Sequence, residues 1–252
     1  MIFHVKCSIA TVLVFAILVC SCVAASPAKG EKTADKAMEA AIQVVQKKCK
    51  VVNPVDQSNR DLLDVLVNKS NMLDKTFIPD ELVTVDIPFG ESVTKDRRKM
   101  RKDAARALEK MVATMKKSKL NVIGISGYRS FQSQLYVLSG YVKTKGFSKA
   151  NRTSACPGQS EHQTGLAMDI GSTGNHGVLG LSFGKTNEYK WIIKNADQYG
   201  FIIRYPLGKE KITGYSYEPW HLRYVGTKLA GVLKKNKWTL EEYYGDQDQD
   251  LK

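Results

Sequence analysis

Apolar residues recur at helical spacing between residues 94 and 117, and this is the clearest pattern in the chain. Met100, Ala104, Leu108, Met111 and Met115 follow one another at steps of three or four residues, which places them on one face of a helix. The pattern predicts a helix over residues 94–117 that packs on a core. Its methionines are interpreted as flexible core side chains rather than as a cofactor site.

Other stretches alternate between short apolar runs and helical spacing. Gly200 is expected to end one predicted helix, and Thr239 with Glu242 has the spacing of a capping box that begins a short final helix. The apolar run 62–67 is too short to assign. Because helices and strands mix without a regular repeat, the sequence predicts an α+β fold with a small antiparallel or mixed sheet. The predicted strands are 121–126, 201–205 and 221–225, and the predicted helices are 37–48, 130–141 and 187–199.

The first 25 residues have the order of a secretory signal peptide. A weakly positive start leads into an apolar run over 9–19, which small residues follow. The run is shorter than the ~20 apolar residues that a membrane-spanning helix needs, although a retained anchor is an alternative. Two processing routes stay open, namely cleavage near Ser26 or lipid attachment at Cys22, where the sequence resembles a lipoprotein box. Both routes predict a secreted or cell-envelope protein, and the lipid would anchor it to the membrane.

The rest of the chain divides into an arm, one domain and a tail. Residues 26–58 are predicted to form a linker, which ends at residue 36, and an N-terminal helix after it. Residues 59–245 are predicted to form a single domain, and residues 246–252 a polar tail. Cys49 and Cys156 are the cysteines that lie clear of the signal. They can pair in an oxidising compartment, but the sequence does not establish that they are close.

The formal net charge is +13. Such a surface suits nucleic acid, anionic lipid or wall polyanions. The secretion signal argues against nucleic acid, and the basic residues are scattered apart from a cluster at 97–102, which we interpret as a solvated helix face. We therefore expect no nucleic-acid partner.

Histidines and carboxylates gather in two segments of the second half of the chain. His162 and Asp169 lie in the segment 160–169, and His221 lies at the end of the segment 218–221. Two imidazoles and one carboxylate are a set that catalytic zinc accepts, with a fourth position left for water. If 166–170 is a strand, its alternation directs Asp169 away from its apolar neighbours. The sequence therefore predicts that His162, Asp169 and His221 bind Zn²⁺.

Two further residues have the types that peptide hydrolysis needs. Glu218 precedes His221 by three residues and is the predicted general base for an attacking water. Pro219 disfavours helix at Glu218, so this segment is expected to be extended or turned. Arg129 lies where a predicted strand meets a predicted helix, and its planar guanidinium matches a carboxylate or an oxyanion. His176, in a loop-like context, is expected at the surface.

The order of these motifs resembles the signature of the M15 metallopeptidases. The run Ser160-x-His162-x-x-Gly165-x-Ala167-x-Asp169, with Glu218-x-Trp220-His221 after it, is similar to the VanY-type D-alanyl-D-alanine carboxypeptidases and the related L,D-carboxypeptidases. The run 126–130 and Gln134 match the same family, and the resemblance covers residues 61–225.

That resemblance implies a fold shared with hedgehog-type peptidases, with a small, mainly antiparallel sheet flanked by helices. It implies Zn²⁺ as the cofactor, Glu218 as the catalytic base and Arg129 as a contact to the substrate or the transition state. Gln134 and Ser160 are weaker candidates for the substrate cleft. The implied reaction is removal of a terminal D-alanine from peptidoglycan stem peptides.

Two other functions stay open at this stage. One is a peptidoglycan endopeptidase of the same fold, which would need a groove open at both ends. The other is a cell-wall-binding module that keeps zinc but has lost catalysis, and the presence of Glu218 argues against it. The choice between D,D and L,D cleavage and the oligomeric state do not follow from the sequence.

Overall fold

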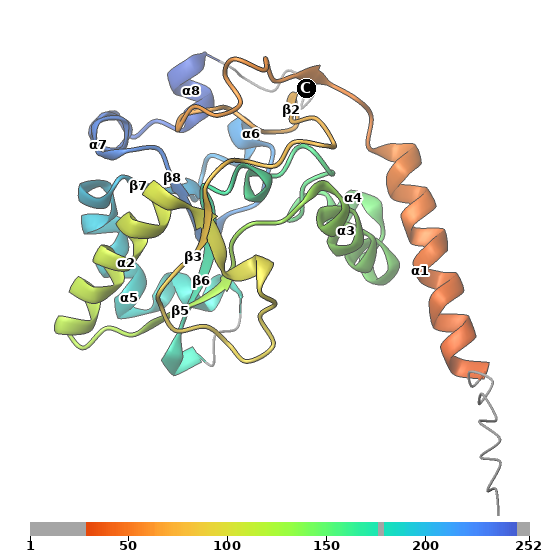
Figure 1. Cartoon of the computed structure of the whole chain (residues 1–252), viewed down its shortest axis with the longest axis horizontal. Helices are drawn as coiled ribbons and strands as arrows, with labels where there is room; N and C mark the ends of the chain where they lie inside the picture. Colours follow the sequence, from red (N-terminus) through yellow and green to blue (C-terminus); the bar gives the residue numbers. More distant parts are fainter. Residues whose placement is uncertain (1–28, 176–178, 246–252) are drawn as a thin grey trace, which may run out of the picture.

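The computed structural model describes residues 29–175 and 179–245 (Figure 1). The predicted signal peptide, His176 and the predicted polar tail lie outside the described residues. Among the helices of the described part, none combines the length and the apolar composition that a membrane crossing requires.

The centre of the fold is a four-stranded sheet in which every neighbouring pair of strands is antiparallel. The strand order is β5-β6-β8-β7. Two small two-stranded sheets flank it, one parallel and one antiparallel. The predicted α+β fold with a mainly antiparallel sheet is thereby confirmed. The strands are β1 (Asn53–Pro54), β2 (Asn71–Met72), β3 (Leu82–Thr84), β4 (Lys99–Arg101), β5 (Val122–Ser126), β6 (Ala167–Ser172), β7 (Phe201–Tyr205) and β8 (Glu218–Tyr224).

Helices lie on both sides of the central sheet, and α1 is separated from it by α3 and α4. In the view of Figure 1, α2, α5 and α7 lie on one side of the strands, and α1, α3 and α4 lie on the other. Short 3₁₀ turns connect several elements, and one of them, η2 (Glu161–Thr164), carries part of the site. The α-helices are α1 (Lys29–Lys48), α2 (Lys102–Lys117), α3 (Phe131–Lys145), α4 (Phe147–Ala150), α5 (Asn187–Asn195), α6 (Glu210–Thr213), α7 (Thr227–Asn236) and α8 (Leu240–Tyr244).

The helix predicted over 94–117 begins later than expected. Residues Lys99–Arg101 form β4, whose backbone pairs with β3, and the helix starts only at Lys102. Met100 is fully buried, but it belongs to the strand β4 and not to the helix. The four-residue step from Met100 to Ala104 fits a helix. It fits equally well a strand that ends one residue after Met100 and leads into a helix. The periodicity therefore found the core face and misplaced the boundary.

Other boundaries differ for local reasons. The helix predicted at 130–141 runs to Lys145 and ends before Gly146, which has a positive φ of 76°. The helix predicted at 187–199 is α-helical only to Asn195 and then tightens into a 3₁₀ turn before Gly200, which has the expected left-handed conformation. The first helix begins at Lys29, inside the predicted linker, and residues 62–67 form neither helix nor strand. The capping box of Thr239 and Glu242 is present, as predicted.

The main core forms where α2 packs on the sheet. Leu108, Met111 and Met115 of α2 belong to one buried cluster with Met168 and Ile170 of β6. All residues of β6 are buried, so this strand is covered on both faces. One face meets the apolar core, and the other is free to carry polar side chains into a protected site.

A second, smaller core joins α1 to α3. Ala41 and Val45 of α1 pack on Leu135 and Leu138 of α3, and the two helices lie side by side in Figure 1. Cys49 at the end of α1 forms a disulfide with Cys156, with Cα atoms 5.7 Å apart. The pairing that the sequence left open is therefore made, and it ties the N-terminal helix to the loop that leads into η2.

Removing this disulfide should destabilise the protein. The bond closes a loop with a sequence separation of 107 residues, and cross-links over loops of this size limit the unfolded chain strongly. We expect a Cys49→Ser, Cys156→Ser double variant to lose about 2–4 kcal/mol of unfolding free energy in denaturant titrations. A reducing agent should lower the wild-type stability similarly and leave the double variant unchanged. Equal stability of both proteins under oxidising conditions would contradict the prediction.

Candidate active site

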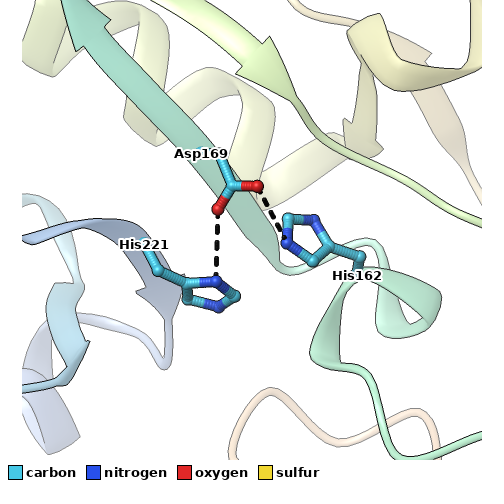
Figure 2. Close-up of side chains that lie close together, drawn as sticks. All are labelled: His162, Asp169 and His221. Carbon is cyan, nitrogen blue, oxygen red and sulfur yellow. Dashed lines mark ion pairs between the residues drawn. The ribbon is translucent and has the colours of Figure 1, made fainter. Parts of the chain in front are cut away.

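Three elements bring His162, Asp169 and His221 together (Figure 2). His162 belongs to η2, Asp169 to β6 and His221 to β8. Asp169 and His221 are direct cross-strand partners in the β6–β8 ladder, so the register of the sheet places them side by side. Gly165 ends η2 with a φ of 71°, which a residue with a Cβ rarely adopts.

Ring nitrogens and carboxylate oxygens of these residues face one another. Nε2 of His162 lies 3.3 Å from Oδ2 of Asp169, and Nδ1 of His221 lies 3.2 Å from Oδ1. One ligand atom from each residue lies within 4.8 Å of the others. Ligand atoms about 2.0–2.2 Å from a tetrahedral zinc are about 3.3–3.6 Å apart, close to the two nitrogen-to-oxygen distances. The spacing of the cluster therefore fits a zinc ion.

In each imidazole ring, the nitrogen that points away from the cluster has a hydrogen-bond partner. This partner fixes the orientation of the ring and so of the nitrogen that points into the cluster. Nδ1 of His162 is 2.7 Å from the carbonyl oxygen of Gly127, and Nε2 of His221 is 3.3 Å from Oε2 of Glu161. Because a carbonyl and a carboxylate only accept, each ring can donate outward, and in its neutral form it then turns a lone pair inward. Within the described residues, Nε2 of His162 and Oδ1 of Asp169 are buried without a hydrogen bond. Such buried atoms are rare in proteins, and a metal ion would satisfy them.

A glycine is required at position 127, whose carbonyl oxygen is the hydrogen-bond partner of His162. A Cβ at this position would lie 2.3 Å from the carbonyl oxygen of Lys99, so a side chain would force the backbone apart. The glycine allows the end of β5 to lie against β4 while its own carbonyl accepts from His162.

The surroundings tune the four ionisable groups of the site. Burial alone would raise the pKa of Asp169, but the two imidazoles hold it well below its usual range. Burial, together with the positive charge of Arg129, lowers the pKa of His162 to about 4. Burial opposes protonation of His221, yet the two carboxylates that face it raise its pKa to about 9. Burial raises the pKa of Glu218 to about 8, the direction expected for a carboxyl group that exchanges protons near neutral pH.

Glu218 lies beside the cluster, as the sequence predicts. It is the first residue of β8, so the segment is extended as expected, and it is 5 % exposed. Its Oε2 lies 3.8 Å from Nδ1 of His221. This is the side of the ring that faces Asp169, so the carboxyl group borders the space where the three ligand atoms converge.

Arg129 approaches the same centre from the junction of β5 and α3. Its backbone N–H donates to the carbonyl oxygen of His162 at 3.2 Å, which fixes the start of its side chain. Its Nε is buried and makes no hydrogen bond within the described residues. The charges of Asp169 and Glu218 act on it favourably. The site therefore contains a cation with hydrogen-bonding capacity left for a ligand.

Gln134 and Ser160 are both buried near the loop that leads to His162. Nε2 of Gln134 donates to the carbonyl oxygen of Ala155 at 2.8 Å and to Oγ of Ser154 at 3.2 Å, whereas its Oε1 has no partner among the described residues. Ser160 is the residue before η2, and its carbonyl oxygen accepts from the N–H of Gln163. Both positions support the loop, and their contact with a substrate stays a prediction.

The sequence reasoning missed a buried charge cluster behind the histidines. Glu161 accepts from Nε of Arg204 and from Nη1 of Arg223, both at 2.6 Å, and the two guanidinium groups are fully buried. Burial would raise the pKa of Glu161, but these arginines hold it well below its usual range. An arginine inside each of the predicted strands at 201–205 and 221–225 was the available signal, because arginine is rarely buried unless paired.

Solved structures share this arrangement of elements. The LD-carboxypeptidase LdcB, whose structure addresses peptidoglycan recognition, is 45% identical, with a TM-score of 0.73 over 79% of this chain and 93% of LdcB. A variant of the vancomycin-resistance D,D-pentapeptidase VanY in complex with Zn(II) is 31% identical, with a TM-score of 0.55 over 72% of this chain and 98% of VanY. The fold and its cluster define the class of this protein, which is a carboxypeptidase.

The family is equally clear from the sequence comparisons. Residues 97–227 match the VanY family, described as D-alanyl-D-alanine carboxypeptidase. YodJ of Bacillus subtilis (strain 168), named a carboxypeptidase, is 47% identical over 186 residues, which are 74% of this chain and 68% of YodJ. The chain belongs to the VanY family of D-alanyl-D-alanine carboxypeptidases within the M15 metallopeptidases, as its motifs predicted.

Proposed function

We propose that this protein is a zinc-dependent carboxypeptidase that removes the terminal D-alanine from peptidoglycan stem peptides. The observation that carries the proposal is the convergence of three inward-facing ligand atoms, from His162, Asp169 and His221, beside a buried glutamate. Zinc held by these residues would polarise the scissile carbonyl group and make a water molecule more acidic. The names of the relatives, which include D-alanyl-D-alanine and LD-carboxypeptidases, support the substrate class.

Glu218 has the position and the environment of the general base. Its carboxylate would accept a proton from the attacking water and return it to the nitrogen of the departing alanine. Burial raises its pKa, which strengthens it as a base, while the charge of Arg129 favours its ionised form. Both proton transfers use the same oxygen atoms, so the residue does not have to move far between them.

Arg129 has the character of a carboxylate receptor. Its Nε, which has no hydrogen-bond partner in the described part of the chain, and its planar donors match the free carboxylate that ends an exopeptidase substrate. An endopeptidase would place an uncharged peptide bond at that point and would gain less from the guanidinium.

Replacing Arg129 with alanine should therefore remove the preference for a free C-terminus. We expect kcat/KM on a peptide acid to fall about 10²–10³-fold, because a desolvated charged hydrogen-bonded pair contributes about 2–5 kcal/mol. The corresponding C-terminal amide should be a poor substrate of the wild type and should be little affected by the change. Arg152→Ala, at an exposed position, is the matched control and should behave as wild type. An unchanged acid-to-amide ratio in the Arg129→Ala variant would exclude this role.

Mass spectrometry of defined muropeptides tests the reaction itself. Shortening of a pentapeptide stem to a tetrapeptide would assign D,D activity, and shortening of a tetrapeptide to a tripeptide would assign L,D activity. Internal cuts would replace the proposal with an endopeptidase. Zinc binding without any cleavage of these substrates would favour a non-catalytic binding module.

The proposed location is the cell envelope, outside the cytoplasmic membrane. The residue pattern of the first 25 positions supports export, and peptidoglycan is found there. Metabolic labelling with a fatty acid separates the two processing routes. A label that disappears in Cys22→Ser would assign the lipid anchor, and an unlabelled mature protein that begins near Ser26 would assign ordinary cleavage.

A further inference from the structure

Glu161 precedes His162 in the chain but faces the other histidine of the cluster. Successive residues of a 3₁₀ turn point about 120° apart, so η2 directs His162 toward Asp169 and Glu161 toward β8. Oε2 of Glu161 lies 3.3 Å from Nε2 of His221. The glutamate is 1 % exposed, so this contact is shielded from bulk solvent.

The other carboxylate oxygen of Glu161 is held by two arginines from neighbouring strands. Oε1 accepts from Nε of Arg204 on β7 and from Nη1 of Arg223 on β8. Nη2 of Arg223 also donates to the carbonyl oxygens of Leu63 and Val65, at 2.8 and 2.9 Å. The carboxylate of Glu161 is therefore fixed on the side away from His221.

Arg204 is fixed in turn by the C-terminal helix. Its Nη1 and Nη2 donate to the two carboxylate oxygens of Glu241 in α8, at 2.8 and 2.5 Å. Glu161, Glu241, Arg204 and Arg223 are all buried, and their formal charges cancel. Glu161 thus brings a rigid acceptor to His221 while the cluster as a whole adds no net charge beside the metal site.

We propose that Glu161 is a positioning residue that orients His221 for metal binding, with Arg204 and Arg223 holding it in place. By accepting from Nε2–H, it selects the tautomer in which the lone pair of Nδ1 points at Asp169. The carbonyl oxygen of Gly127 performs the same task for His162. The two histidines therefore bind through different nitrogens, Nε2 for His162 and Nδ1 for His221.

A matched pair of variants separates positioning from structural support. Glu161→Asp and Glu241→Asp each shorten a buried acceptor of Arg204 by one methylene and keep its charge, but only Glu161 contacts His221. We expect Glu161→Asp to weaken zinc binding about 10–100-fold, measured on the purified protein by competition with a chelator and without substrate. Glu241→Asp should bind zinc as the wild type does, because Arg223 still holds Oε1 of Glu161, although both variants should unfold at lower temperature. Wild-type zinc affinity in Glu161→Asp, or equal losses in both variants, would overturn the inference.

The zinc-loaded wild type provides a second test that needs no variant. Long-range ¹H–¹⁵N spectra of the histidine rings should show a proton on Nε2 of His221 and on Nδ1 of His162. A proton on Nδ1 of His221 would refute the role of Glu161 even if Glu161→Asp did not fold. The inference rests on the proposed metal site, but its failure is distinguishable. A wild type that binds no zinc removes the proposed function, whereas zinc bound with the wrong tautomer removes only the role of Glu161.

Discussion

Glu218→Gln should abolish hydrolysis while the protein still folds and binds zinc. Glutamine has the same shape but cannot accept and return a proton, and general-base catalysis contributes about 10²–10⁴-fold. We expect kcat on a stem peptide to fall by about that factor with KM little changed, because the residue acts on the attacking water rather than on the bound peptide. Steady-state kinetics together with the zinc content of the purified variant measure both parts of the expectation.

The stability of the Glu218→Gln variant controls for a loss of activity through unfolding. The carboxyl group of Glu218 is buried and its pKa is raised by burial, so a neutral amide should be tolerated at least as well as the native side chain. Glu91→Gln, at an exposed position, is the matched variant and should retain full activity. Turnover of Glu218→Gln within a few-fold of the wild type would remove Glu218 from the mechanism, whatever its zinc content.

Asp169→Asn should lose both zinc and activity. The change keeps the size of the side chain within the fully buried β6 but replaces an anionic ligand with a neutral amide. Structural zinc sites with four protein ligands contribute about 10–16 kcal/mol in total, so one ligand accounts for about 2.5–4 kcal/mol. We therefore expect zinc affinity to fall about 10²–10³-fold, measured by chelator competition, and activity to be lost at limiting zinc.

The matched control for this change is a surface aspartate. Asp197 forms an ion pair with Lys234 at 2.6 Å, and exposed pairs of this kind contribute at most about 1 kcal/mol. Asp197→Asn should therefore bind zinc and hydrolyse the substrate as the wild type does. Removal of zinc by a chelator should inactivate the wild type reversibly. Undiminished zinc affinity in Asp169→Asn would mean that the three converging side chains are not the metal site.

The sequence was a good guide to elements whose signal is local. The apolar spacing of α2, the strand β5, the capping box at Thr239 and the extended segment at Glu218 were all visible as patterns of neighbouring residues. The start of α2 was not, because β4 exists only through its pairing with β3. Backbone hydrogen bonds between segments far apart in the chain leave no trace in the spacing of apolar residues.

The sequence by itself determined which side chains are available for zinc chemistry, since few histidines lie beyond the signal and the motifs around them are specific. The tertiary structure decided how they act. The β6–β8 register places Asp169 opposite His221, and η2 turns Glu161 toward a histidine 60 residues away rather than toward its neighbour. The physical reason is that motif spacing records only residue type and order. Which nitrogen of a ring faces into the site depends instead on acceptors that come from other strands and turns, and these meet only in the folded chain.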